Sequence, residues 1–342
     1  MAKAANPLRE AVHVCAQRYR QYAGDKRARK EFARHCQALG LKLPWRDYLR
    51  ARKQTGCEVR EYFAFEFYKK DDAQRDTYLT LQRHDAFTKA VGDVNRAITI
   101  PGNKVLFNMI FGAFLQREWI NPSACTAEEF IAFVKKHGRV MVKPSDSCSG
   151  KGIHIFAYED DEKTRACYDE LVGTGALAEE LLKQHPQMDR LNPHCINTVR
   201  VATYTDRDDV HILFATARSG MNESIVDNFG AGGVSVAVDW KTGKIIADAI
   251  DQEYRRIATL PMTGTTLQGF RIPNWDKALD VVRRAARLAY TLPQCHWIGW
   301  DLAFLANDEV AIVEGNWRQG PLSQNTHPKG IYHELKELSK KL

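Results

Sequence analysis

Two acidic residues near the C-terminal end of the sequence are spaced to face each other across a hairpin. The segment at 297–316 contains two apolar, β-rich runs that flank a turn-type Asn-Asp pair at 307–308. With the turn centred on this pair, Asp301 lies opposite Glu314, with the Cβ atoms about 5 Å apart. Asn316, two residues along the strand, shares the face of Glu314. The spacing therefore predicts three oxygen-bearing side chains on one face of the hairpin.

Two carboxylates that face each other between apolar strands destabilise a fold unless a cation lies between them. A set of oxygen donors suits Mg²⁺ or Mn²⁺, and Mg²⁺ held by few carboxylates usually also binds phosphates. The alternative interpretation is that Asp301 only begins an edge strand and that Glu314 only ends one. The mirrored spacing favours a metal site with Asp301, Glu314 and Asn316 as its ligands.

A second candidate group surrounds Lys143, where a short strand at 139–143 leads into the small-residue loop SDSCSGKG at 145–152 and a further strand at 153–156. Such a loop can offer backbone N–H groups to phosphates, although many Ser/Gly loops bind nothing. It matches neither the Walker A motif nor G-x-G-x-x-G. Lys143 lies between apolar neighbours, so we expect it to be half-buried and to need an anionic partner.

Two further stretches could complete a nucleotide site. Asn103 is a suitable N-cap for an amphipathic helix, and the free N–H groups there could help Lys104 to attract an anion. The alternative is a plain surface lysine. The run LAEELL at 177–182 predicts a strand that leads into a connector at 183–193. This stretch could supply the backbone edge and the apolar walls that a nucleotide base needs.

Two arginines occupy strands farther along the chain. Arg200 lies in a predicted strand at 196–204, and Arg218 ends another at 211–218. Arg200 could bind an anionic substrate or simply reach solvent from an exposed sheet face. The loop DNFGAGG at 227–233 holds three glycines close together. Such a loop implies an unusual backbone conformation, the close approach of a ligand or a plain wide turn.

The composition is that of an ordinary globular protein. The chain has 342 residues, 44% of them hydrophobic, which is enough for two or three subdomains with a core. No apolar run approaches the ~20 residues of a membrane span, and the first residues lack the apolar core of a signal peptide, so we expect a cytoplasmic protein. The eight cysteines form no C-x-x-C pair, which indicates reduced thiols rather than a disulfide framework or a zinc site.

The net charge of +7 is concentrated at the N-terminal end, where residues 1–60 hold 15 Lys and Arg against 5 Asp and Glu. The pattern at 8–40 predicts two helices with a break at 24–25, and the dense aromatic cluster at 45–81 is expected to be core. A solvated helix face is the simplest interpretation of the basic residues; an anionic substrate, nucleic acid or a membrane surface would also fit. No nucleic-acid-binding motif accompanies them, so we expect no nucleic-acid partner.

In kind and order, these features resemble the ATP-grasp superfamily over roughly residues 95–325. The features are Asn103-Lys104, VKP at 142–144 with its Ser/Gly loop, Glu179-Glu180, and the triplet Asp301, Glu314 and Asn316. Further stretches are similar to its sugar-transfer-associated branch, namely QHP at 184–186, INTVRV at 196–201, DNFGAGG at 227–233 and GNWRQGP at 315–321. This branch is often linked with surface-polysaccharide or natural-product pathways.

The resemblance implies an α+β protein with the ATP-grasp fold, in which two α+β subdomains clamp ATP, preceded by an N-terminal helical region. The expected parts are a basic, mainly helical region at 1–95, an ATP-grasp subdomain at 96–178 with the Lys143 strand and the phosphate loop, and a C-terminal ATP-grasp subdomain at 179–342 with the Mg-binding hairpin. The helical start departs from the α/β subdomain that begins many ATP-grasp ligases, and it could dictate the substrate or a partner.

The resemblance also implies roles for individual residues. The phosphates would contact Lys104, Lys143 and the loop residues Ser149 and Gly150. The adenine would lie against Glu179, Glu180 and Leu182, and the ribose nearest Gln184 or Asp189, although the usual ribose-binding acid is not clearly placed. One or two Mg²⁺, or Mn²⁺ in their place, would bind Asp301, Glu314 and Asn316. The acceptor side would include Arg200, Arg218, Asn228 and Arg318.

The implied activity is that of an ATP- and Mg-dependent ligase, which activates a small-molecule carboxylate as an acylphosphate for attack by an amine. Because metals and lysines neutralise the transferred phosphoryl group, no side-chain nucleophile is required. The same residues would serve a kinase that passes the γ-phosphate to a hydroxyl or a carboxylate, so the sequence leaves both open. A non-catalytic nucleotide-binding module would typically have lost a metal ligand, and none is lost here. Neither the two substrates nor the oligomeric state follows from the sequence.

Overall fold

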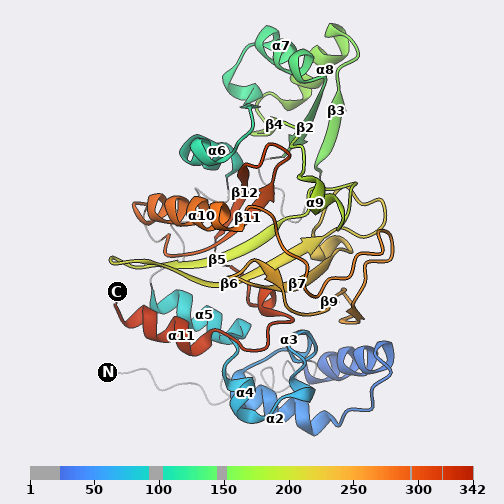
Figure 1. The fold of residues 1–342 in the computed structure, drawn as a ribbon, viewed down its shortest axis with the longest axis vertical. Helices are drawn as coiled ribbons and strands as arrows, with labels where there is room; N and C mark the ends of the chain where they lie inside the picture. Colours follow the sequence, from blue (N-terminus) through green and yellow to red (C-terminus); the bar gives the residue numbers. More distant parts are fainter. Residues whose placement is uncertain (1–23, 92–102, 145–151, 293–294, 318, 342) are drawn as a thin grey trace, which may run out of the picture.

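Three parts follow one another down the molecule in Figure 1. The computed structural model describes residues 24–91, 103–144, 152–292, 295–317 and 319–341. A small lobe with a four-stranded sheet lies above an eight-stranded sheet and its helices, which we call the body, and a helical region lies below the body. Helices and antiparallel sheets together confirm the predicted α+β class.

The helical region packs around its own aromatic core. It contains a helix at 24–38, α2 (Trp45–Thr55), α3 (Val59–Ala64), η1 (Phe67–Lys69), α4 (Asp72–Asp76) and α5 (Leu81–Ala90). Its fully buried side chains include Tyr48, Tyr62, Phe63 and Phe67. The prediction that the aromatic cluster is core is therefore confirmed. The helix predicted before position 24 lies outside the described residues.

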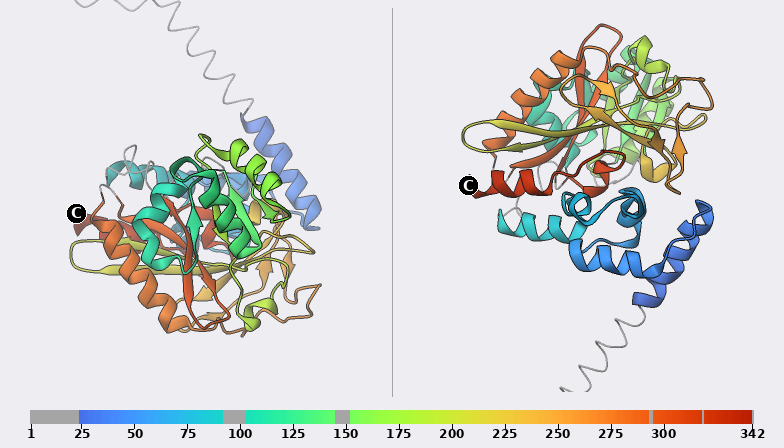
Figure 2. Two further views of the ribbon diagram at one scale, coloured as in Figure 1. Left: turned by 90° about the horizontal axis from the view of Figure 1, so that it is seen from above. Right: turned by 60° about the horizontal axis from the view of Figure 1, so that its bottom comes forward.

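The C-terminal segment fastens the helical region to the body, as Figure 2 shows in red. Gln324, in η6 (Pro321–Gln324), accepts a hydrogen bond from Leu79 N at 3.3 Å and donates one to Leu79 O at 2.9 Å. Tyr78 Oη donates to His327 O at 2.6 Å. The chain then runs through α11 (Tyr332–Leu338) and η7 (Ser339–Lys341).

The small lobe is an antiparallel sheet with two α-helices and a short 3-10 helix. Its strands are β1 (Trp119–Ile120), β2 (Arg139–Lys143), β3 (His154–Ala157) and β4 (Leu177–Glu180), in the order β1-β4-β2-β3. Its helices are η4 (Pro122–Ala124), α7 (Ala127–His137) and α8 (Asp161–Leu171). The capping box of Thr126 and Glu129 begins α7, and Gly138, with φ 70°, ends it.

The body is an antiparallel sheet with strand order β10-β9-β7-β6-β5-β11-β12, and β8 pairs with β7. The strands are β5 (Val199–Thr205), β6 (Val210–Ser219), β7 (Val234–Asp239), β8 (Lys244–Ile245), β9 (Ala249–Ile250), β10 (Arg256–Ile257), β11 (Trp297–Phe304) and β12 (Val310–Trp317). The connections include α9 (Pro186–Asp189) and η5 (Phe229–Ala231).

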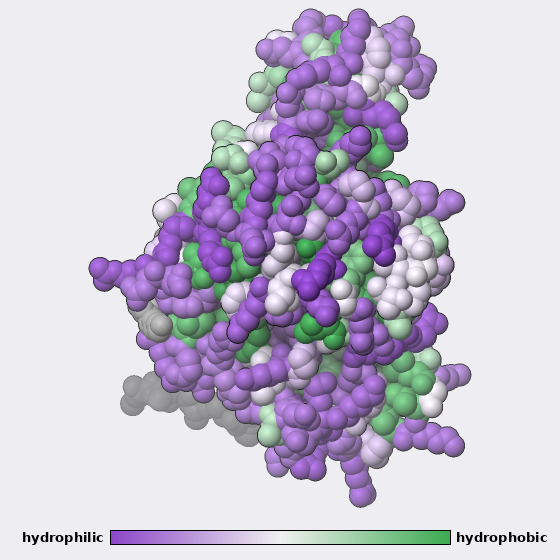
Figure 3. Space-filling model, in the orientation of Figure 1, coloured by the Kyte–Doolittle hydropathy of each residue, from purple (hydrophilic) through white to green (hydrophobic). Residues whose placement is uncertain are grey.

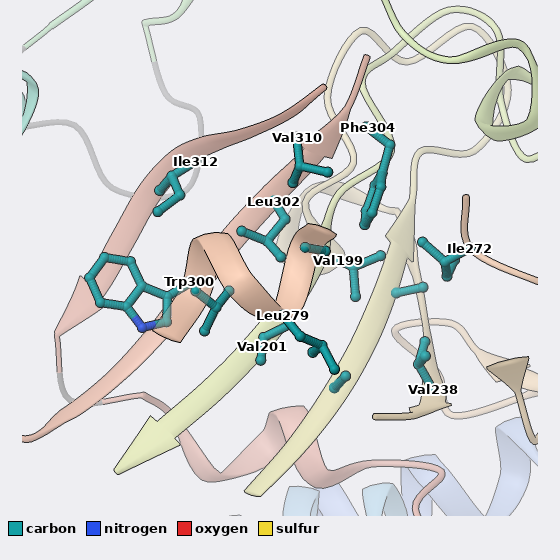
Figure 4. Close-up of a cluster of buried hydrophobic side chains, with 14 of the residues drawn as sticks. Val199, Val201, Val238, Ile272, Leu279, Trp300, Leu302, Phe304, Val310 and Ile312 are labelled. Atoms are coloured by element: carbon teal, nitrogen blue, oxygen red, sulfur yellow. The ribbon is translucent and has the colours of Figure 1, made fainter. Parts of the chain in front are cut away.

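Helix α10 (Trp275–Tyr290) buries its apolar face against this sheet. Figure 4 shows Leu279 of the helix among Val199, Val201 and Leu302 of the strands. Because β-strand side chains alternate between the two faces, Arg200 lies on the face opposite Val199 and Val201. The core therefore turns the polar residues of β5 away from α10.

Helix α6 (Lys104–Phe111) and η3 (Gly112–Phe114) also join the core of the body. Phe111 contacts Trp300 with ring centroids 5.4 Å apart, and a Cβ at Gly315 would lie 2.8 Å from Phe107 Cε2. Asn103 caps the helix by accepting from Leu106 N at 3.0 Å, as predicted. The predicted subdomain at 96–178 places α6 with the Lys143 strand. This boundary stays a prediction, although α6 packs on the body.

The hairpin of β11 and β12 carries the two carboxylates. Asp301 pairs with Glu314, as predicted. Nearer the turn Leu302 pairs with Ile312, which is one position away from the pairing that a turn centred on 307–308 would give. A β-bulge leaves Val313 unpaired and so restores the pairing at Asp301.

The face of the molecule in Figure 3 is mostly hydrophilic, with scattered apolar patches. Among the helices of the described residues, none combines the length and the apolar character that crossing a bilayer demands. The described cysteines are free thiols, as expected, and Cys15 and Cys148 lie outside the described residues.

Candidate functional site

A cleft between the small lobe and the edge of the body sheet gathers most of the predicted site residues. Both parts line it, the small lobe with β2 and β4 and the body with β6, β11 and β12. Among the lining residues are Lys104, Lys143, Glu179, Glu180, Leu182, Arg218, Asn228, Asp301 and Glu314. Segments far apart in sequence therefore meet at one surface.

Asp301 lies at the base of the cleft and is held by two arginines. Arg200 Nε donates to Asp301 Oδ1 and Arg200 Nη2 to Asp301 Oδ2, both at 2.7 Å. Arg218 Nη2 lies 2.7 Å from Asp301 Oδ2. The Asp301 side chain is only 2% exposed. Burial alone would raise the pKa of this carboxyl, but the Arg200 and Arg218 guanidinium groups outweigh it and hold the pKa well below its usual range.

Glu314 experiences the opposite influence. Its place at the base of the cleft and the neighbouring Asp301 carboxylate raise the pKa of Glu314 above its ordinary value. Its side chain remains 47% exposed, so it faces the cleft. Arg200 is more distant from it, with Nη2 4.0 Å from Glu314 Oε1. One carboxylate of the pair is therefore compensated by protein cations, and the other is not.

Asn316 completes the predicted triplet. Its Nδ2 donates to Asp301 Oδ2 at 3.1 Å and to Glu314 Oε1 at 3.0 Å, so the three side chains converge as the spacing predicted. Within the described ranges, no three His, Cys, Asp or Glu side chains form a cluster suited to a metal. The protein donors at the hairpin are two carboxylates and one amide. Oxygen donors and a carboxylate that resists ionisation fit a divalent cation completed by phosphate oxygens.

Lys143 has the anionic partner that we expected, and that partner is Glu179 of β4. Arg117 Nη2 and Asn108 Nδ2 each donate to Glu179 Oε1 at 2.9 Å. Burial alone would raise the pKa of Glu179, but Arg117 and Lys143 outweigh it and hold the pKa well below its usual range. Neither Arg117 nor Asn108 was predicted, because a lone arginine in a QRE run and an asparagine within a helix carry no distinctive sequence signal.

Lys104 contacts the end of the segment that carries Lys143. Lys104 Nζ donates to Pro144 O at 2.9 Å, directly before the phosphate loop. Ser149 and Gly150, predicted to contact phosphates, lie outside the described residues, and so does Arg318 on the acceptor side.

The predicted adenine segment borders the cleft, but Gln184 does not. Glu180 Oε2 accepts from Glu118 N at 3.1 Å, and Leu182 packs against the buried cluster of Ala303, Leu305 and Ala311. Gln184 is buried, accepts from Asn197 N at 2.6 Å and donates to Asp189 Oδ1 at 2.9 Å. Both ends of its amide therefore serve the protein interior, and its position does not support the predicted ribose contact for Gln184 or Asp189.

The start of the glycine-rich loop, which belongs to the predicted acceptor side, lines the cleft. Asp227 Oδ2 accepts from Thr198 N at 2.9 Å, and Arg218 Nη2 donates to Thr198 Oγ1 at 2.7 Å. Asn228 Oδ1 accepts from Gly230 N at 2.8 Å and so caps the short helix η5. Gly232 has φ 97°, and a Cβ at Gly233 would lie 2.7 Å from Asp227 O. Gly232 and Gly233 therefore mark an unusual backbone, which was one of the predicted alternatives.

Comparison with known proteins identifies the family. Residues 103–340 match the family model described as sugar-transfer associated ATP-grasp. The chain belongs to this family. The predicted resemblance and the predicted ATP-grasp fold after an N-terminal helical region are thereby confirmed. The helical region at 24–90 precedes the part that matches the sugar-transfer-associated ATP-grasp family.

Solved structures give weaker likenesses. D-alanyl-alanine synthetase A from Vibrio cholerae matches with 12% identity and a TM-score of 0.41, over 71% of this chain and 65% of the synthetase. VanG D-Ala:D-Ser ligase from Enterococcus faecalis matches with 13% identity and a TM-score of 0.43, over 72% of this chain and 62% of the ligase. Among curated proteins, none matches the sequence.

Proposed function

We propose that the protein is an ATP- and Mg²⁺-dependent ligase that activates a small-molecule carboxylate as an acylphosphate and joins it to an amine. The observation that carries the proposal is the cleft that Lys104 and Lys143 line together with the carboxylate pair of Asp301 and Glu314. Cations and metal-binding oxygens around one cleft suit a nucleoside triphosphate between them.

Phosphate binding is assigned to the two lysines. The Glu179 charge is shared between Arg117 and Lys143, so the cluster keeps a net positive charge for an anion in the cleft. Ser149 and Gly150 are proposed to donate backbone N–H groups to the same phosphates. The adenine is assigned to Glu180 and Leu182.

The metal is assigned to Asp301, Glu314 and Asn316. Bound Mg²⁺ would neutralise the charge that spreads over the transferred phosphoryl group. Asp301 Oδ2 already accepts from Arg200, Arg218 and Asn316. Glu314 therefore offers a metal the more accessible oxygens, whereas Asp301 Oδ2 is already occupied by these three donors.

The carboxylate substrate is assigned to the arginine side of the cleft. One oxygen of its carboxylate attacks the γ-phosphorus, a new P–O bond forms, and the bond to the β-phosphate oxygen breaks to release ADP. The amine then attacks the acyl carbon, inorganic phosphate leaves, and the amine proton passes to solvent. Arg200 and Arg218, with Asn228 and Arg318, are proposed to orient the carboxylate, since two guanidinium groups share the single charge of Asp301 and so leave positive charge for a substrate anion.

An isotope experiment tests the reaction class. The protein is incubated with ATP, Mg²⁺ and a pool of ¹⁸O-labelled amino acids and sugar-linked carboxylates together with acceptor amines. Transfer of ¹⁸O into released phosphate, with an amide as the second product, is the expected result. ADP formation with the phosphate remaining on an acceptor would replace the ligase by a kinase. Absence of any ADP in every pool would overturn both.

A further inference from the structure

Arg117 lies where the chain leaves the body for the small lobe. It directly precedes the lobe, and Gln116 before it has a left-handed backbone with φ 51°. The chain returns to the body beside it, because Glu180 N donates to Glu118 O at 2.9 Å and Glu118 N donates to Glu180 Oε2 at 3.1 Å. Arg117 therefore occupies the joint between the two walls of the cleft.

The guanidinium of Arg117 connects three segments. Its Nη1 donates to Leu115 O at 3.1 Å and to Ile312 O at 2.9 Å. Its Nη2 donates to Val313 O at 3.1 Å and to Glu179 Oε1 at 2.9 Å. The side chain is 1% exposed, and its Nε–H is buried without a partner. So many donors in one plane distinguish arginine from lysine.

Two of these contacts fall on the β-bulge. β12 is the edge strand of the body sheet, so carbonyl groups that point away from β11 have no strand partner. Arg117 supplies donors to the carbonyls of Ile312 and Val313, and Val313 is the unpaired residue of the bulge. Glu314 follows directly, so the backbone that carries the exposed carboxylate is held by a side chain at the base of the small lobe.

The fourth contact reaches the phosphate side. Glu179, which accepts from Arg117, also pairs with Lys143. Without Arg117, the Glu179 charge would be matched mainly by Lys143, which would leave less positive charge for an anion. One side chain thus contacts both the strand that carries Glu314 and the ion pair that holds Lys143.

We propose that Arg117 is a positioning residue, which holds Glu314 and Lys143 at the separation at which both act on one nucleotide. This inference rests on the proposed ATP site and deepens it. Arg117→Lys keeps the charge but presents a single nitrogen, which cannot span Glu179 and the two carbonyls of the bulge. The variant should therefore weaken the dependence of the ATP affinity on the metal, without removing charge from the cleft.

The test measures coupling between metal and nucleotide. Calorimetry gives the affinity for ATP in EDTA and in Mn²⁺, and the ratio of the two is the coupling. In Arg117→Lys the coupling is expected to fall about tenfold to 100-fold, the range seen when residues that orient metal ligands are changed. This loss should exceed the change in affinity for metal-free ATP. Arg165→Lys, which alters an exposed pair with Glu128 on the same lobe, is the matched control and should keep the wild-type coupling.

Each outcome has a defined meaning. Wild-type coupling in Arg117→Lys overturns this inference alone, and so does an equal loss of affinity for metal-free and Mn²⁺-bound ATP, which a merely structural role would give. If Arg117→Lys does not fold, Glu179→Gln takes its place, because this substitution weakens the hydrogen bond between Arg117 and Glu179 at its acceptor. Its coupling should also fall about tenfold, and wild-type coupling there counts against the inference. Failure of the wild-type protein to bind ATP at all overturns the proposed function as well.

Discussion

The two carboxylates of the hairpin have unequal surroundings. Two guanidinium groups hold Asp301 in its ionised form, whereas desolvation and the charge of Asp301 favour the protonated form of Glu314. A divalent cation can take the place of that proton, because it supplies the positive charge that Glu314 lacks. The chemical role that we propose therefore depends more on Glu314 than on its better-paired neighbour.

Replacing Glu314 by Gln should lower ATP turnover by about 100-fold or more, since a neutral amide is a weaker ligand than a carboxylate for the Mg²⁺ that would neutralise the transferred phosphoryl group. The fold should persist, because Glu314 is half exposed and Gln keeps an oxygen that can accept from Asn316 Nδ2. Steady-state kinetics and circular dichroism measure the two effects. Glu309→Gln, at the exposed turn of the same hairpin, is the control and should turn over normally. Near-normal turnover in Glu314→Gln would remove the metal assignment.

The raised pKa of Glu314 also predicts how stability depends on pH without metal. The folded protein binds this proton more tightly than the unfolded chain does, so the stabilisation is present below the ordinary value of 4.5 and is lost as pH rises through the raised pKa. Glu314→Gln cannot ionise, so its melting temperature in EDTA should match the wild type at pH 4 and exceed it increasingly toward pH 8. A difference that does not change with pH would contradict the assigned environment.

At the scale of elements, the connector after β4 is fixed by buried amides rather than by regular structure. Gln184 accepts from Asn197 N, and Asn197 Nδ2 donates to Asn192 O at 2.7 Å. Ser219 Oγ donates to Asn197 Oδ1 at 2.7 Å, which ties the connector to the end of β6. The network keeps Leu182 at the cleft while the following residues turn inward.

Gln184→Ala separates the structural role from the ribose role. The substitution should cost about 1–3 kcal/mol of unfolding free energy, because it leaves buried partners such as Asn197 N without a hydrogen bond. The affinity for ATP should stay within about threefold of the wild type, since a change below 1 kcal/mol is expected for a residue outside the cleft. Urea unfolding and calorimetry measure the two quantities, and the exposed neighbour Lys183→Ala is the control. A large loss of ATP affinity at unchanged stability would reinstate the ribose contact.

At the scale of the whole molecule, the helical region contacts the turn at 252–256, which in turn contacts the glycine-rich loop. Tyr254 stacks on Phe63 with ring centroids 6.5 Å apart, and Arg256 pairs with Glu66. In the same turn, Gln252 Nε2 donates to Phe229 O of the glycine-rich loop at 2.8 Å. The helical region therefore supports the segment that holds this loop, and its docking matters to the site.

Gly330→Ala should loosen that docking. A Cβ at Gly330 would lie 2.3 Å from Tyr78 Cα, which is a backbone atom and cannot move away through a change of side-chain rotamer. The expected cost is about 1–3 kcal/mol or more of unfolding free energy. Limited trypsin digestion should cut the basic helical region earlier than in the wild type. Gly320→Ala is the control, because a Cβ there meets no atom within 4 Å and should change neither measurement.

The sequence by itself determined most of the elements and the central pair of the site. The strands and helices follow from local periodicity and caps, such as the capping box that begins α7. Asp301 and Glu314 could be paired because both belong to one hairpin, where short-range geometry fixes the partners. The order of such motifs was also enough to indicate the ATP-grasp family, which the family match confirms.

Only the tertiary structure decided which distant residues share these carboxylates. It brings Arg200 and Arg218 to Asp301, turns Gln184 into the interior, and places Arg117 between the bulge and Glu179. These contacts join segments that local patterns treat independently. The packing of the sheets and lobes determines which residues become partners, because a buried charge is stable only where packing supplies its counter-charge and hydrogen bonds.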